Sequence, residues 1–177
     1  MIIAPTLASL SLAALVIIAA VCDVRARRIP NWLVGCGLAI ALAVQCAVLG
    51  PAAGSWAWIT GAAAGMGLFL GVYLLGGMGA GDVKLMGAVG AFVGPLGALD
   101  IALTSFLVGG VLALAMTLVR KESRRTLASL STLLLSLPFG ARAIPLRRES
   151  QTNGDTMRLP YAVAIAAGTL LVKWTML

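Results

Sequence analysis

Long apolar segments dominate the chain, and short polar, glycine-containing or proline-containing stretches separate them. Six such segments can be read, at residues 2–22, 32–49, 56–75, 83–94, 97–119 and 159–177. A helix needs about 20 mostly apolar residues to cross a bilayer, and most of the segments approach that length. The fourth segment is shorter and rich in glycine. The pattern predicts an all-α polytopic membrane protein with about six transmembrane helices.

Helices are favoured over a closed barrel because the segments lack the alternation of apolar and polar residues that barrel strands show. Pro51 and Gly54 mark one turn, and the pair Gly94-Pro95 marks another. Either Pro30 or Asn31 is expected to open the second helix, as a proline in the first turn or as an N-cap.

Composition supports this interpretation. The 177 residues are 60% hydrophobic and only 11% charged, whereas about a quarter of the residues in a soluble domain are charged. So few charges exclude a soluble enzyme and a nucleic-acid binder, whose basic residues would lie on a polar surface. We therefore expect membrane lipid, and no nucleic acid, among the partners.

The basic residues predict the topology. All but one of the 13 lysines and arginines fall on alternate loops, which must share one side of the membrane. The positive-inside rule makes that side cytoplasmic and leaves both termini outside. The longest of these loops, residues 120–158, has an apolar centre between basic clusters. It fits an interfacial helix or a simple charged connector equally well. We expect residues 1–177 to form a single membrane domain.

Only six carboxylates occur, and two of them are expected at the cytoplasmic boundary. Asp23 ends the first apolar segment and Asp82 precedes the fourth. Two carboxylates held close together cannot both ionise easily, so one can activate water while the other, protonated, polarises the carbonyl under attack. The alternative is structural: Asp23 caps a helix or pairs with Arg25 or Arg28, and Asp82 caps the fourth helix.

Other chemistries lack the residues they need. The chain has no histidine, and its three cysteines form no CxxC pair. A zinc site and a histidine-based triad are therefore excluded or very weakly supported. We expect no metal and no cofactor.

Four glycines occur in the six residues before Asp82. Glycine lets backbones approach closely, which suits either a peptidase whose substrate backbone must reach the dyad or a simple helix-packing interface.

Three blocks resemble the type IV prepilin peptidase family, a group of GxGD aspartic membrane peptidases. Residues 79–85 read GAGDVKL, and residues 23–31 read DVRARRIPN. A third block, LPYAVAIAAG at residues 159–168, is similar to the family's C-terminal segment. All three occur in the family's order.

The resemblance implies an endopeptidase that removes the basic leader from prepilins or pseudopilins at the cytoplasmic face of the bacterial inner membrane. Asp23 and Asp82 match the catalytic pair. Gly79, Gly81, Lys84, Pro30 and Asn31 match the motif residues around them. The chain resembles the short form found in tight-adherence (Flp) pilus systems, because it lacks the CxxC-containing region of the larger members. No methyltransferase activity is therefore expected.

Two other functions stay open at this point. One is a small proton-coupled transporter component that uses the two acids as relay groups, although such acids usually lie nearer the bilayer centre. The other is a non-enzymatic assembly component of a pilus or secretion machine. The pilin cleaved and the oligomeric state cannot be read from the sequence.

Overall fold

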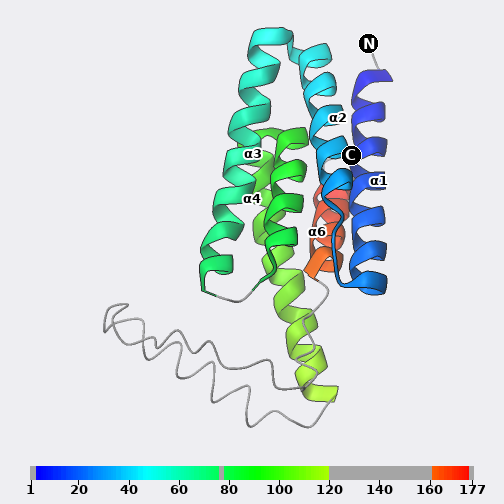
Figure 1. The fold of residues 1–177 in the computed structure, drawn as a ribbon, viewed down its shortest axis with the longest axis vertical. Helices are drawn as coiled ribbons and strands as arrows, with labels where there is room; N and C mark the ends of the chain where they lie inside the picture. Colours follow the sequence, from blue (N-terminus) through cyan, green and yellow to red (C-terminus); the bar gives the residue numbers. More distant parts are fainter. Residues whose placement is uncertain (1–2, 76–77, 120–160, 176–177) are drawn as a thin grey trace, which may run out of the picture. The chain divides into compact units, whose positions relative to one another are not determined.

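The computed structural model describes residues 3–75, 78–119 and 161–175. Regular structure in these ranges is helical throughout, which confirms the all-α class (Figure 1). The helices are α1 (Ile3–Ala26), α2 (Asn31–Leu49), α3 (Pro51–Leu74), α4 (Ala80–Val119) and α6 (Tyr161–Thr175). The predicted basic loop at 120–158, with its possible interfacial helix, lies outside the described residues.

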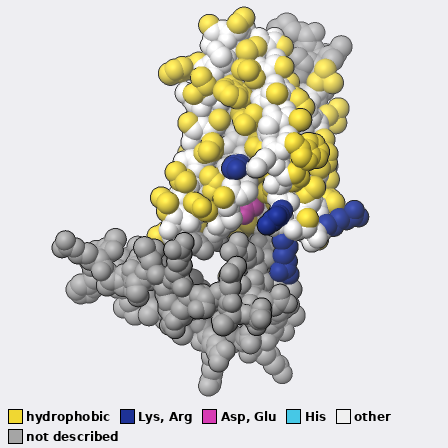
Figure 2. Space-filling view, in the orientation of Figure 1, with side chains coloured by type: hydrophobic (Ala, Val, Ile, Leu, Met, Phe, Trp, Pro, Cys, Tyr) yellow, Lys and Arg dark blue, Asp and Glu magenta, His cyan; other side chains and the backbone are white. Residues whose placement is uncertain are grey.

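Four of the described helices are long and apolar enough to cross a membrane, and α6 contributes a shorter apolar stretch. Their apolar side chains are also widely exposed, as Figure 2 shows in yellow over the visible face. An apolar surface of this extent is typical of helices that face lipid. The number of spans and the sidedness of the termini stay predictions.

Several helix boundaries differ from the sequence-based expectation, two of them by a turn or more. The first helix continues one turn beyond residue 22 and ends at Ala26, so that Asp23 is helical. The third begins at Pro51 instead of residue 56. Proline reads as a turn signal, but its fixed φ and missing N–H are compatible with the first turn of a helix. The second helix begins at Asn31, directly after Pro30, as expected.

Helix α4 is broken at Gly94, where φ is 78° and ψ is 178°, and Pro95 follows. The chain reverses direction there (Figure 1), so residues 80–93 and 95–110 form two arms. This is the turn that the Gly94-Pro95 pair predicted. Glycine is needed because side-chain-bearing residues rarely adopt this φ.

The break leaves backbone carbonyls of α4 without their helical N–H donors. A side chain from α2 donates to these carbonyls instead. The carbonyl of Ala91 would normally accept from residue 95, but Pro95 has no N–H. The amide nitrogen Nε2 of Gln45 lies 3.3 Å from the Ala91 oxygen and 3.0 Å from the Phe92 oxygen. Gln45 is only 8% exposed. It satisfies acceptors that apolar surroundings would otherwise leave unpaired.

Helices α3 and the first arm of α4 pack backbone against backbone. A side-chain carbon at Gly61 would collide with the carbonyl of Gly90, and one at Gly90 would collide with the carbonyl of Gly61. A carbon at Gly65 would likewise meet the carbonyl of Met86. Small residues at such crossings allow the close approach on which helix association in lipid depends.

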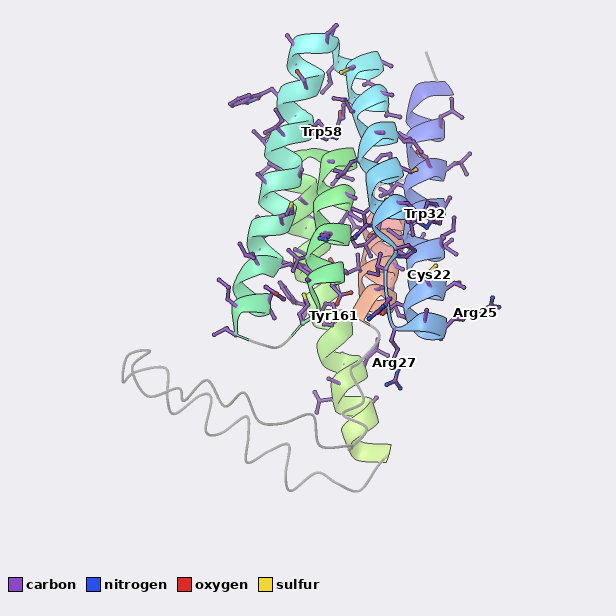
Figure 3. The ribbon with its side chains drawn as sticks, viewed as in Figure 1. Cys22, Arg25, Arg27, Trp32, Trp58 and Tyr161 are labelled. Atoms are coloured by element: carbon purple, nitrogen blue, oxygen red, sulfur yellow. The ribbon has the colours of Figure 1, made fainter. Side chains whose placement is uncertain are left out.

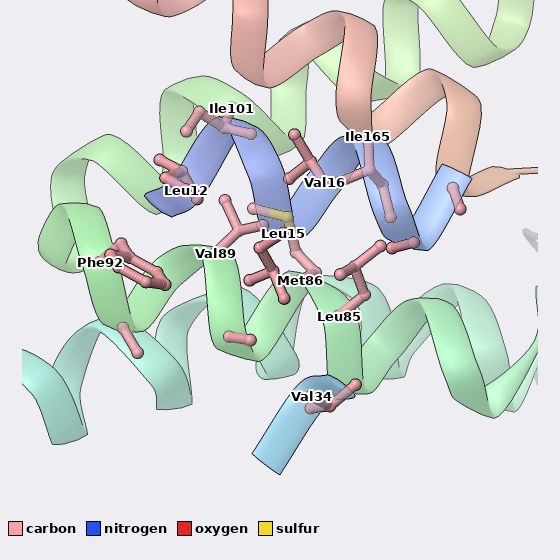
Figure 4. Packing of buried hydrophobic residues seen from close by; sticks show 14 of the residues in the cluster. Leu12, Leu15, Val16, Val34, Leu85, Met86, Val89, Phe92, Ile101 and Ile165 are labelled. Atoms are coloured by element: carbon pink, nitrogen blue, oxygen red, sulfur yellow. The ribbon is translucent and has the colours of Figure 1, made fainter. Parts of the chain in front are cut away.

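The described residues divide into two compact units. The larger comprises residues 3–75, 78–110 and 161–175, and residues 111–119 of α4 belong to the other. The core of the larger unit joins the first, fourth and last described helices. Figure 4 shows Val16 of α1, Ile101 of α4 and Ile165 of α6 in this cluster, all at most 1% exposed. The prediction that residues 1–177 form a single domain is left untested.

The glycine crossing leads to a stability prediction. Gly61→Ala places a methyl group against the Gly90 carbonyl, so the free energy of unfolding should fall by about 1–3 kcal/mol. Gly67→Ala is the matched control on the same helix, since Gly67 is exposed and a carbon there meets nothing within 4 Å. The control should be neutral or stabilising. Unfolding in detergent micelles measures both, and equal effects would contradict the crossing.

The hydrogen bonds from Gln45 to the Ala91 and Phe92 carbonyls lead to a second stability prediction. Gln45→Leu keeps a similar volume but removes both donors, leaving two buried carbonyls unpaired. The free energy of unfolding should fall by about 1–3 kcal/mol. Val48→Leu, at an exposed position of α2, should change it little. A Gln45→Leu protein as stable as the parent would show that the bridge contributes nothing.

Candidate active site at the ends of α1, α4 and α6

Asp23 lies in the last turn of α1 and is half-buried. Its Oδ2 accepts a hydrogen bond of 3.3 Å from the backbone N–H of Ala162 in α6. Among the residues that the structure describes, no arginine forms an ion pair with it. The neighbouring Arg25 and Arg27 are exposed, and Figure 3 shows both side chains at the surface of this end of α1. The described contacts therefore do not support the alternative in which Asp23 pairs with an arginine.

Asp82 lies in the first turn of α4 and is 9% exposed. Its Oδ2 accepts the N–H of Gly79 at 3.3 Å, and its own N–H donates to the Gly79 carbonyl at 3.1 Å. The carboxylate thus caps the helix by reaching back to the residue before it, as the acidic member of a capping box does. A side-chain carbon at Gly79 would lie only 3.3 Å from the same oxygen. Glycine at this position gives the carboxylate room.

The two carboxylates share one site. The negative charge of Asp23 acts on Asp82, although the two come from different helices. The sequence presented helix capping and a role beside Asp23 as alternatives for Asp82, but the cap does not prevent the Asp23 charge from acting on it. Figure 2 shows an acidic side chain at the surface with basic side chains close to it.

Two helix N-termini meet at this pair. Asp82 is in the first turn of α4, and the amide that donates to Asp23 is in the first turn of α6. The positive end of a helix dipole favours a nearby negative charge. The arrangement offsets part of the cost of keeping a carboxylate ionised beside apolar helices.

The other motif residues connect the segment before α2 to the start of α4. The Ile29 side chain lies 3.5–3.6 Å from where a side-chain carbon at Gly81 would be. The Nζ of Lys84 donates to Oδ1 of Asn31 at 3.2 Å. Pro30 precedes α2, and its carbonyl accepts the N–H of Leu33 at 3.1 Å. The two sequence blocks that contain Asp23 and Asp82 are thus in direct contact beside the carboxylates.

Tyr161 is a neighbour of the pair that sequence reasoning did not place among the site residues. The electrostatic field of the Asp82 carboxylate reaches its hydroxyl, and Figure 3 shows it at the start of α6. Its ring is 5.9 Å from that of Phe69, edge-on, and 6.4 Å from that of Phe106. The only signal for it in the sequence was its place in the C-terminal LPYAVAIAAG block.

The described residues contain no group of three or more His, Cys, Asp or Glu side chains that could hold a metal ion. The described cysteines, Cys22, Cys36 and Cys46, are free thiols.

Comparison with known proteins adds a family. The model of the type IV leader peptidase family matches residues 10–114, more than half of the chain, and this range includes both Asp23 and Asp82. Tyr161 and Ala162 lie beyond it. No significant match was found among curated proteins or among solved structures. The family match, over a range that contains both members of the carboxylate pair, shows that the chain belongs to the type IV leader peptidase family.

Proposed function

We propose that the chain is a membrane aspartic endopeptidase that cleaves the basic leader from type IV prepilins or pseudopilins. Family membership implies leader-peptide cleavage. The observation that supports the mechanism is that the blocks bearing Asp23 and Asp82 meet through the Lys84–Asn31 hydrogen bond and the packing of Ile29 beside Gly81, so that the charge of Asp23 acts on Asp82. We place the protein with the short, tight-adherence form and assign it peptide hydrolysis without methyl transfer.

In the proposed mechanism, one carboxylate takes a proton from water as the water oxygen attacks the carbonyl carbon of the scissile peptide. The other carboxyl, protonated, donates to the carbonyl oxygen. Breakdown of the tetrahedral intermediate then breaks the C–N bond. The proton held by the base goes to the leaving amine, and the hydroxyl that re-forms the carbonyl returns its proton to the other carboxylate. The proximity of two like charges supports this division of roles, because such a pair favours a state with one proton between them.

We further propose about six spans in the bacterial inner membrane, with both termini outside and the two arms of α4 counted separately. The exposed Arg25, Arg27 and Arg28 follow Asp23 directly, and Lys84 closely follows Asp82. Basic residues beside both acids support an active site at the cytoplasmic face. The leader of a prepilin stays on that side.

Asparagine substitutions test the carboxylates directly. Asp23→Asn and Asp82→Asn keep an oxygen that can accept the Ala162 or Gly79 N–H, but neither can carry the acid–base proton. Each should slow cleavage at least about 100-fold. The measurement is the size of a prepilin co-expressed with each variant, together with the amount of enzyme in the membrane. Asp100→Asn, at an exposed position of α4, is the matched control and should cleave normally.

If both asparagine variants process prepilin, the peptidase mechanism is wrong. An assembly component or a transporter would then be the better interpretation. Loss of cleavage with normal membrane accumulation would exclude a purely structural role for the two acids.

Substrate choice should depend little on leader charge. The exposed arginines beside Asp23 carry the same sign as a basic leader, so attraction between the two cannot select the substrate. We expect the apolar helix of the pilin to provide recognition and the glycine before the cleavage site to give access. Removing leader charges should therefore slow cleavage less than a bulky substitution at that glycine, measured as relative initial rates. Equal sensitivity to the two changes would refute this view.

A further inference from the structure

The first turn of α6 contacts the surroundings of both carboxylates. The N–H of Ala162 donates to Asp23 across 139 residues of sequence, and the neighbouring Tyr161 hydroxyl lies within reach of the electrostatic field of Asp82. No comparison assigns a role to these residues, since the family match ends at residue 114.

Helix geometry explains why this amide is available. The first four N–H groups of a helix have no acceptor within it and must bond elsewhere. Ala162 is the second residue of α6 and is fully buried. An unpaired N–H there would be costly, and the Asp23 carboxylate is its acceptor. Bonds between an N–H and a charged oxygen are stronger than bonds between neutral groups.

Aromatic packing holds this turn in position. The rings of Phe69 and Phe106 stack at 4.9 Å, and the Tyr161 ring packs against both. On the second arm of α4, a side-chain carbon at Gly109 would collide with the Tyr161 ring at 2.8–2.9 Å. The absence of a side chain at Gly109 thus allows the tyrosine to lie close to α4. Helices α3 and α4 therefore fix the place from which Ala162 donates.

We propose that the first turn of α6 is a positioning element of the active site, in which the Ala162 amide orients the Asp23 carboxylate and the Tyr161 ring holds the turn in register. The proposal rests on the proposed peptidase function. With Oδ2 engaged by the amide, Oδ1 is the oxygen of Asp23 that has no partner among the described residues. It is the oxygen available to exchange a proton with water or substrate.

Proline substitution removes the amide without removing the helix. Ala162→Pro deletes the donor in the first turn, where proline is compatible with helical geometry. Val163→Pro is the matched control, since it also introduces proline into this turn but leaves the Ala162 N–H in place. Ala162→Gly is the conservative variant, because it keeps the N–H and removes only a methyl group.

The measurement is the kcat and KM of purified, detergent-solubilised enzyme on a prepilin substrate. Ala162→Pro should lower kcat by about 10- to 100-fold, the loss expected for one hydrogen bond to a charged group, with KM nearly unchanged. Ala162→Gly should retain at least about ten times the kcat of Ala162→Pro. If Val163→Pro loses as much kcat as Ala162→Pro, or if Ala162→Pro retains full kcat, the amide does not position Asp23.

A ring variant keeps the proposal testable if Ala162→Pro accumulates poorly. Tyr161→Leu removes the aromatic contacts but leaves the amide, so it should lower kcat by loosening the turn. Combined with Ala162→Pro, it should lower kcat by much less than the product of the two single effects, because both act through one bond. Multiplicative effects, or a Tyr161→Leu protein with full kcat, would overturn the proposal.

Asp23→Asn in the same assay separates this inference from the proposed function. If Asp23→Asn is inactive and Ala162→Pro is fully active, only the positioning role fails. If Asp23→Asn itself cleaves prepilin, the peptidase mechanism fails, and the positioning role fails with it.

Discussion

Close approach of helix backbones is the constraint on which this architecture depends. Apolar side chains gain little by leaving lipid for one another, so helices in a bilayer associate through packing and polar contacts. Many of the hydroxyl side chains bond within their own helix, as Thr60 does to Trp56 and Thr169 to Ile165. Backbone contact between α3 and α4, at Gly61 and Gly90, is therefore a main contribution to the association of these helices. It sets the position of the arm that begins beside Asp82.

The reversal at Gly94 has two consequences for the site. The first arm of α4 is about 21 Å long at 1.5 Å per residue, shorter than the hydrocarbon core of a bilayer. Its end would then lie within the apolar layer, where the bridge from Gln45 replaces the donors that water cannot supply. The second arm runs back and brings Phe106 and Gly109 to Tyr161. Because of this one break, a single helix carries Asp82 on its first arm and, on its second arm, the residues that pack against the start of α6.

The sequence predicted those features that local composition encodes. Apolar runs located the helices, Gly94-Pro95 located the reversal, and motif blocks located Asp23 and Asp82. It could not predict the partners of Gln45 or the pairing of Gly61 with Gly90, because these depend on which helices become neighbours. The contact of Ala162 with Asp23 could not be predicted for a different reason. Its contribution to the site is a backbone N–H, a group that nearly every residue has, and its side chain is that of any buried alanine.

The bond between Asp23 and Ala162 also has a consequence for biosynthesis. Asp23 belongs to α1, and its donor belongs to α6, 139 residues later in the chain. Asp23 therefore enters the membrane long before its partner has been translated. Its surroundings are completed only when α6 joins the bundle, so the site can take its final form only after α6 has been translated. Such an order would leave the carboxylate site incomplete while the helices between α1 and α6 are inserted.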